Sequence, residues 1–302
     1  MQHRIHEIAA GVGYLPVSIA NVYFVNGPQG RWVLVDTGLS GKAGMIREAA
    51  ESRYGTGARP EAIILTHGHA DHSGSAADLA DLWRVPIFAH ALEMPYLTGQ
   101  SKYPPADPTA PGFMSFLTRF LKPQPANLGD RVQPFSRGEL PGMPGWEWFH
   151  TPGHAPGHVA FFRRLDATLL AGDAFTTMNV DSFLAVVAKK QQVCRPPTPV
   201  TYDWPQARDS VRLLADLKPF TLACGHGVPM KGNEATMQLT ALARHFRTPR
   251  HGRYVPEPAR VDETGVVWVP PAPADPVPKV AVAVGMAAAT AVLVSALRRR
   301  AS

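Results

Sequence analysis

The chain has 302 residues, 45% of them hydrophobic and 18% charged, which excludes a protein that is disordered throughout. Its formal net charge is +6, but residues 1–240 carry 21 basic and 20 acidic side chains, so most of the chain lacks the positive excess of a nucleic-acid-binding domain. Two cysteines exclude a disulfide-rich secreted scaffold, and the first ten residues lack the pattern of a signal peptide, so we expect a cytoplasmic protein.

Short apolar runs alternate with helical patterns along the first 246 residues. The apolar runs predict strands at 18–25, 32–35, 63–65, 86–89, 146–149, 159–162 and 168–170. The helical patterns predict helices at 42–52, 75–83, 205–217 and 233–246. Because strands and helices alternate, we expect a layered α/β fold.

A proline-containing segment at 96–125 interrupts this alternation, with one short helix predicted at 112–121. Long insertions of this kind in a compact domain often serve as lids over active sites. We interpret the segment as an insertion that forms a lid.

The sharpest motif is THGHADH at residues 66–72, which directly follows the apolar run at 63–65. Four metal-capable side chains fall within six residues, in a loop between a strand and a helix. Imidazole and carboxylate groups together suit zinc or a similar divalent ion. The motif therefore predicts a metal site where this strand ends.

Three further segments place metal-capable side chains where an apolar run stops. They are TPGHAPGH at 151–158, AGD at 171–173 and CGHG at 224–227. Glycine in each lets the backbone turn closely. If these strand ends converge on one sheet edge, they supply the ligands that a single loop lacks for two ions.

In this order, the HxHxDH loop, TPGHxPGH, GD and GHG resemble the metallo-β-lactamase superfamily, and the VDTG segment at 35–38 is similar to its early DTG element. The resemblance covers about residues 5–240. It implies an αββα sandwich with the metals at one edge of two sheets. We therefore assign residues 1–247 to a metallo-β-lactamase-like hydrolase domain.

The resemblance also implies a role for each matching residue. It implies two metal sites joined by one carboxylate, with His67, His69 and His154 at the first metal, Asp71, His72 and His226 at the second, and Asp173 between them. Asp71 is in addition assigned the catalytic role. Asp36 would order the metal loop through hydrogen bonds, and His158 would pack against or orient the site without binding metal.

Two divalent ions about 3.5 to 4 Å apart can lower the pKa of a shared water and polarise a carbonyl group. We therefore expect two ions, most simply zinc with iron or manganese as alternatives, and a dinuclear-metal-activated hydroxide. The expected substrate is a small molecule with an ester, thioester or lactone group. No motif specifies its acyl group, the metal used in the cell or the oligomeric state.

Three other functions share features of this pattern. Persulfide dioxygenases carry a similar THxHADH loop but use a single iron, and the GHV ending at 157–159 favours the hydrolase branch. A ribonuclease Z-like phosphodiesterase would need a basic surface, so we expect no nucleic-acid partner. A non-catalytic, metal-stabilised binding protein would need only one closed site.

The remaining charge lies near the C-terminal end, where residues 241–302 carry 9 basic and 4 acidic side chains. Residues 248–278 contain eight prolines and predict a linker with a hairpin turn at 262–265. Residues 280–297 are uncharged and lie between Lys279 and three arginines, which predicts an apolar helix at 279–302 that contacts the membrane through 280–297. An alanine-rich helix packed on the domain is the alternative.

Overall fold

The computed structural model describes residues 4–121, 127–135 and 140–275. Residues up to Pro270 form one compact unit, and the five described residues after it belong to a second unit. No helix within these described ranges is long and apolar enough to cross a bilayer. The apolar helix predicted at 279–302, with its membrane contact at 280–297, lies outside the described residues.

The first half of the chain forms a seven-stranded sheet in which the strand order follows the sequence. Its antiparallel part comprises β1 His6–Ala9, β2 Val12–Val17, β3 Ala20–Asn26 and β4 Trp32–Val35. Its parallel part continues from β4 through β5 Ile63–Ile64, β6 Ile87–Ala89 and β7 Val132–Pro134. The strand predicted at 18–25 begins only at Ala20, because Ser18 adopts a left-handed φ of 61° in the turn after β2.

The second sheet has the strand order β14-β13-β10-β9-β8. These strands are β8 Trp146–His150, β9 Val159–Arg163, β10 Thr168–Gly172, β13 Thr221–Cys224 and β14 Met230–Lys231. Only β10 and β13 pair in parallel. Two short antiparallel ribbons complete the strands, namely β11 Thr176–Met178 with β12 Gln191–Cys194 and β15 Arg260–Asp262 with β16 Gly265–Trp268.

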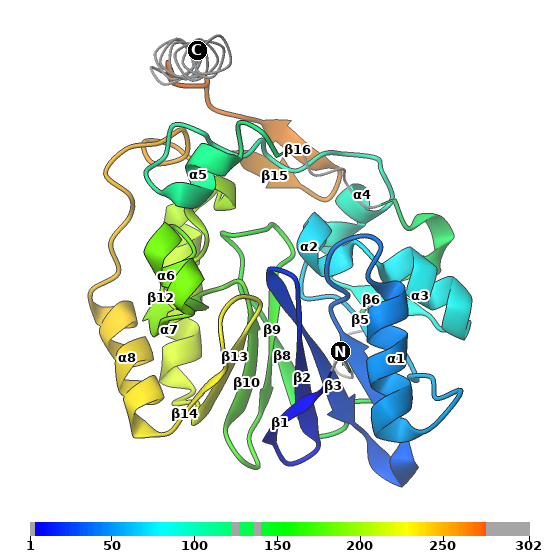
Figure 1. Cartoon of the computed structure of the whole chain (residues 1–302). Helices are drawn as coiled ribbons and strands as arrows, with labels where there is room; N and C mark the ends of the chain where they lie inside the picture. Colours follow the sequence, from blue (N-terminus) through cyan, green and yellow to red (C-terminus); the bar gives the residue numbers. More distant parts are fainter. Residues whose placement is uncertain (1–3, 122–126, 136–139, 276–302) are drawn as a thin grey trace, which may run out of the picture. The chain divides into compact units, whose positions relative to one another are not determined.

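Helices cover the outer face of each sheet (Figure 1). The first sheet carries α1 Ala43–Tyr54 and α3 Ala76–Trp83, and the second carries α7 Trp204–Asp216 and α8 Asn233–Arg244. Shorter helices lie in the connections: α2 Ala70–Ser73, α4 Met94–Leu97, α5 Phe113–Leu117 and α6 Phe183–Ala188. The predicted αββα sandwich is therefore confirmed, and the four long helices match the predicted ones within about two residues.

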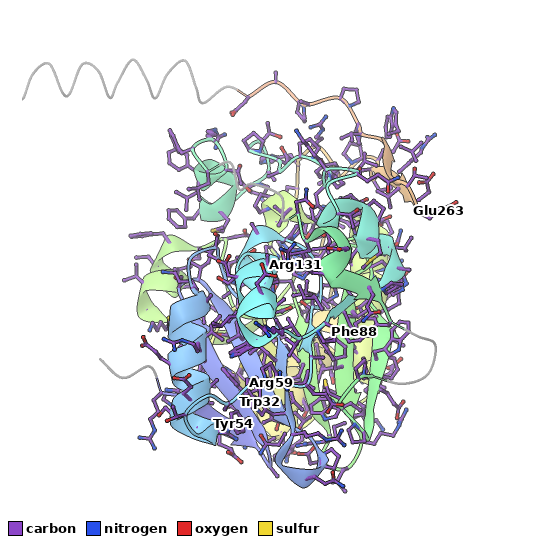
Figure 2. The ribbon with its side chains drawn as sticks, turned by 90° about the vertical axis from the view of Figure 1, so that its right-hand side faces the viewer. Trp32, Tyr54, Arg59, Phe88, Arg131 and Glu263 are labelled. Carbon is purple, nitrogen blue, oxygen red and sulfur yellow. The ribbon has the colours of Figure 1, made fainter. Side chains whose placement is uncertain are left out.

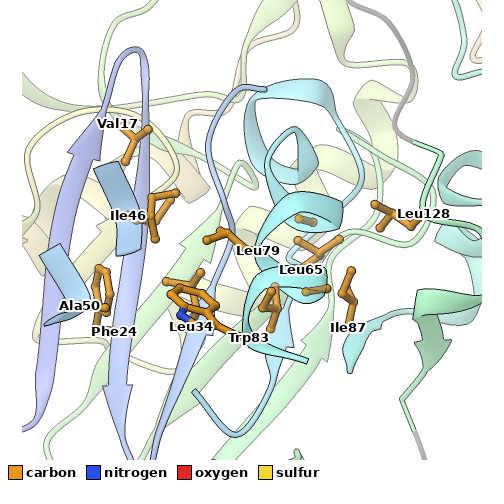
Figure 3. Packing of buried hydrophobic residues seen from close by; sticks show 14 of the residues in the cluster. Val17, Phe24, Leu34, Ile46, Ala50, Leu65, Leu79, Trp83, Ile87 and Leu128 are labelled. Atoms are coloured by element: carbon orange, nitrogen blue, oxygen red, sulfur yellow. The ribbon is translucent and has the colours of Figure 1, made fainter. Parts of the chain in front are cut away.

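Alternation along the strands gives each sheet two buried faces. Phe24 and Leu34 point outward and pack with Ile46 of α1 and with Leu79 and Trp83 of α3 (Figure 3). Their neighbours Tyr23, Val25, Val33 and Val35 point inward and pack against residues of the second sheet such as Phe161 and Leu170. Complete burial of each large apolar side chain contributes about 1.5–3 kcal/mol, so both faces hold the strand ends in place.

Helix α1 is fixed to the first sheet by an aromatic stack. The rings of Trp32 and Tyr54 lie 4.6 Å apart and are nearly parallel, at 8° (Figure 2). Trp83 of α3 packs edge-on against Trp32 with centroids 5.8 Å apart. This aromatic group anchors both helices to β4, the strand that leads to Asp36.

Candidate metal centre

The loops that carry the predicted metal ligands meet at one end of the two sheets. Strands β5, β8, β10 and β13 all run toward this end, where α2 begins (Figure 1). Backbone hydrogen bonds cross from one sheet to the other there: Val159 N–H donates to Thr66 O at 2.9 Å, and Asn21 N–H donates to Gly225 O at 2.8 Å. The first bond sets the spacing between the loop after β5 and the second sheet, and the second bond does the same for β3 and the loop after β13.

Three histidines form the first group of candidate ligands. His69 Nδ1 lies 3.1 Å from His67 Nε2 and 3.0 Å from His154 Nε2. Two nitrogens bound to one tetrahedral zinc ion would be separated by roughly 3.3 Å, given bonds of about 2.05 Å. Burial, with neighbouring histidines adding to it, lowers the pKa of His67 and His154 well below the usual value. Burial also lowers the pKa of His69 to about 4, so all three rings are neutral at pH 7 and their lone pairs can face a cation.

The second group contains Asp71, His72 and His226. His226 Nε2 lies 3.4 Å from Asp71 Oδ2 and 3.1 Å from Asp173 Oδ2. The same Asp173 Oδ2 is 3.4 Å from His154 Nε2, which belongs to the first group. Asp173 therefore contacts both groups, and the seven predicted ligands form one continuous cluster.

The donor set fits a divalent metal. Among the described residues, His72 Nε2 and Asp173 Oδ1 are buried in this cluster without a hydrogen-bond partner, which costs about 1–3 kcal/mol for each atom. Burial lowers the pKa of His226, but Asp173 and Asp71 outweigh that effect and raise it to about 9. These two carboxylates thus favour a positive charge at this point, and a bound cation would replace the proton.

Asp36, at the end of β4, holds the metal loop from behind. Its Oδ1 accepts a hydrogen bond from Thr66 N–H, and its Oδ2 accepts one from the Thr66 hydroxyl, both at 2.8 Å. His72 Nδ1 donates to the same Oδ2 at 2.8 Å, because a carboxylate only accepts. This contact directs His72 Nε2 into the cluster. Burial lowers the pKa of His72, but Asp173, Asp36 and Asp71 outweigh that effect and raise it well above the usual value, so a bound cation would replace the proton on Nε2. Asp36 takes a left-handed φ of 60° to make these contacts.

The strand end before His226 leaves no room for a side chain. A Cβ on Gly225 would collide with Asp173 Oδ1 and His72 Cε1. His226 Nδ1 donates to Ile19 O at 2.7 Å, which turns its Nε2 toward the cluster. This packing explains why the CGHG segment needs its first glycine.

His158 lies behind Asp173 and outside the ligand groups. Its Nε2 accepts a hydrogen bond from Asp173 N–H at 2.8 Å, so the proton of the ring is on Nδ1, which faces the Thr151 hydroxyl at 2.8 Å. Burial lowers the pKa of His158 to about 3 and keeps the ring neutral. The ring therefore fixes the backbone from which the Asp173 carboxylate extends.

We expect His158→Ala to lower metal affinity by about 10–100-fold while His154→Ala removes metal binding at the first group, because His158 only orients a ligand. Metal titration of the purified variants measures this difference. The exposed His245→Ala serves as a control that leaves affinity unchanged. Equal metal loss in the His158 and His154 variants would show that His158 is itself a ligand.

Sequence reasoning missed a buried carboxylate that joins the two main metal loops. Glu93 is fully buried; its Oε2 accepts from Gly68 N–H at 2.8 Å and its Oε1 from Gly157 N–H at 2.6 Å. The Tyr103 hydroxyl also donates to Oε2. Gly68 belongs to the THGHADH loop and Gly157 to the TPGHAPGH loop, so the Glu93 side chain links these two loops.

Tyr103 brings the segment predicted as an insertion, 96–125, against the cluster. Its ring packs edge-on against His69 with centroids 4.5 Å apart, while its hydroxyl contacts Glu93 and Gly68 N. Burial raises the pKa of Glu93, although hydrogen bonds from Tyr103, Gly157 and Gly68 oppose the shift. The sequence signal that could have pointed to Glu93 was its position as a lone carboxylate inside the apolar stretch at 85–97.

The αββα sandwich and its histidine–aspartate cluster define a metal-binding enzyme of the kind that builds its site at the end of two stacked sheets. The sequence model of the metallo-beta-lactamase superfamily matches residues 15–226, and the chain belongs to this superfamily. The family, the fold and the metallo-hydrolase class predicted from the sequence are confirmed at this level.

Several known proteins are similar to the chain. The probable metallo-hydrolase YflN of Bacillus subtilis (strain 168) is 40% identical over 244 residues, which cover 80% of this chain and 92% of that protein. The metallo-beta-lactamase family protein TTHA1429 from Thermus thermophilus shares the fold with a TM-score of 0.55 and 23% identity, covering 79% of this chain and 80% of that one. TTHA1623, solved in a di-iron-bound form, is 26% identical with a TM-score of 0.50, covering 74% of this chain and 92% of that one.

Proposed function

We propose that the protein hydrolyses a small-molecule ester, thioester or lactone with water activated by two divalent metal ions, most simply zinc. The observation that carries this proposal is the position of Asp173 Oδ2, which lies within 3.4 Å of His154 Nε2 in one ligand group and 3.1 Å of His226 Nε2 in the other. A structural zinc site needs only one closed set of four ligands. A carboxylate shared by two open groups instead suits a dinuclear centre.

Each of the predicted site residues would have a distinct role in such a centre. When bound, the two metals supply a hydroxide equivalent near neutral pH and polarise the carbonyl group of the substrate. His67, His69 and His154 would hold the first ion, and Asp71, His72 and His226 the second. Asp173 lies between the two groups and offsets their combined positive charge, while Asp36 and His158 hold the ligands in orientation.

Asp71 and His69 mark the side from which substrate approaches. They are the two partly exposed members of the seven, and the Asp71 side chain is 22% exposed while that of Asp173 is 2% exposed. We assign Asp71 the catalytic role because its carboxylate is the one that both lies in the cluster and reaches solvent. It can accept a proton from the attacking water or pass one to the leaving group.

The comparisons support this proposal from two directions. The similarity to YflN, named a probable metallo-hydrolase, favours hydrolysis. The di-iron-bound form of TTHA1623 favours a centre with two ions and makes iron a reasonable alternative to zinc.

The proposal predicts that metal-loaded protein turns over at least one class of substrate among esters, thioesters and lactones. A chelator should abolish this activity and added zinc should restore it, since the ligands are complete without further protein groups. The measurement is a hydrolysis panel that also contains β-lactams and phosphodiesters, with metal content determined in parallel. One tightly bound iron with oxygen consumption on a persulfide, or cleavage of RNA alone, would contradict the proposal.

A further inference from the structure

Helices α5 and α6, together with residues 118–121 after α5, expose an unusual group of large apolar side chains. Phe120 is 70% exposed, Leu184 76%, Val187 65% and Phe183 55%. Phe116 and Leu121 are also exposed. We call the surface formed by residues 111–121 and 182–190 the α5–α6 face. Large contiguous apolar surface on a protein normally marks a contact with another molecule or a membrane.

The two halves of this face are held together by the fold. Phe113 N–H donates to Asp181 O at 2.8 Å, and the rings of Phe113 and Phe183 pack edge-on with centroids 5.1 Å apart. The Ser182 hydroxyl accepts from Ala185 N–H at 3.3 Å and caps α6. The two helices lie next to each other in Figure 1. The apolar side chains are therefore presented by one joined surface.

The charged residues within the two segments of the face have a single sign. Residues 111–121 and 182–190 contain Arg119, Lys189 and Lys190 and no carboxylate. Both lysines are exposed at the end of α6. The nearest acid in sequence, Asp181, is only 12% exposed; it accepts from the Thr198 hydroxyl and lies 3.7 Å from Arg195. An anionic surface would meet cations here with no opposing carboxylate from these two segments.

We propose that the α5–α6 face docks the protein on an anionic lipid membrane. Phenylalanine, leucine and valine beside a lysine pair suit the boundary between headgroups and acyl chains, where the apolar groups insert and the cations contact anionic lipid. Protein interfaces are also rich in phenylalanine but are poor in lysine, so the lysine pair is the feature that favours a membrane over a protein partner. The apolar sequence at 280–297, followed by three arginines, is a separate feature that also suits contact with an anionic membrane.

Docking through this face would bring the metal centre close to the membrane. Helix α6 follows Asp173 through the short strand β11, and Phe113 N–H bonds to the same connection at Asp181. Downstream of α6, the Thr201 hydroxyl lies 3.5 Å from His154 Nδ1. The face therefore lies at the ligand end of the sheets, and the turn that contains Leu165 lies at the opposite end of β9 and β10.

The apolar part of the proposal is tested with the full chain and vesicles that contain about 30% anionic lipid. Phe120→Ser combined with Leu184→Ser should lower vesicle partitioning by about tenfold, since two large side chains lose their apolar burial. The matched control is Leu165→Ser, which removes a side chain that is 92% exposed at the far end and should change nothing. Equal partitioning of the double variant and the wild-type protein would overturn the proposal.

The cationic part is tested by Lys189→Gln with Lys190→Gln. This change should lower partitioning by about thirtyfold on anionic vesicles and leave it unchanged on neutral phosphatidylcholine. Lys218→Gln is the control, because Lys218 is also exposed and its left-handed φ of 50° is close to the 47° of Lys189. Phe120→Trp should gain fluorescence quenching by brominated lipid, and Leu165→Trp should not. Absence of the quenching gain, or variants that change only the oligomeric state, would overturn membrane docking.

Discussion

Asp173→Asn should lower kcat/KM for hydrolysis by at least about a thousandfold, equivalent to about 4 kcal/mol of transition-state stabilisation. The asparagine keeps the volume of the side chain but removes the negative charge that lies 3.1 Å from His226 Nε2 and 3.4 Å from His154 Nε2. Two cations held close together repel each other, so the neutral amide should also release at least one of them. The fold should persist, because Asp173 N–H still donates to His158 Nε2.

Metal content by elemental analysis, kcat/KM and far-ultraviolet circular dichroism together check this expectation. Asp209→Asn provides the control, because Asp209 is exposed on α7 and its ion-pair partners are Arg208 and Arg212, which are not metal ligands. A variant that keeps two metal equivalents and normal turnover would refute the bridging role. A variant that loses one equivalent but keeps full activity would refute the need for two ions.

Much of the fold was predictable because burial leaves a clear pattern in the long elements. Trp32–Val35 is apolar at every position and is buried on both faces, as the sandwich requires. The strands β1 and β2 were missed because Gly11, Gly13 and Pro16 interrupt their alternation, and pairing with β3 supplies the order that local preference lacks. Helix α6 was missed because its apolar residues face solvent, so it carries no amphipathic pattern.

The ligand cluster could be predicted from the sequence because each motif that carries ligands is short and lies at a strand end. His67, His69, Asp71 and His72 are fixed relative to one another by a single loop, so local spacing already describes much of the site. Glu93 was not readable in this way. Its partners Gly68 and Gly157 are 25 and 64 residues away, and only the packing of two sheets brings their N–H groups to one carboxylate.

Glu93→Leu should destabilise the metal-free protein by about 3 kcal/mol or more and lower metal affinity by about 10–100-fold. Leucine fills a similar volume but accepts no hydrogen bond, so Gly157 N–H loses its acceptor and Gly68 N–H keeps only the Tyr103 hydroxyl. The two metal loops would then be joined less firmly, which spreads His67 and His154 apart. Urea unfolding of the metal-free protein and metal titration of the folded protein measure the two effects separately.

Glu93→Gln separates the hydrogen bonds from the charge. Its amide oxygen can still accept from Gly157 N–H, and the Tyr103 hydroxyl can rotate to accept from the amide NH2. The NH2 group cannot accept from Gly68 N–H, which keeps only the Tyr103 hydroxyl, so part of the metal affinity should return. Glu61→Leu is the matched control, because Glu61 is partly exposed in a 3.4 Å pair with Arg31 and should change stability by only about 0.5 kcal/mol. If Glu93→Leu kept wild-type metal affinity while losing stability, Glu93 would support the fold alone. A parallel loss that glutamine partly restores would instead show that Glu93 positions the metal loops through its hydrogen bond from Gly157 N–H.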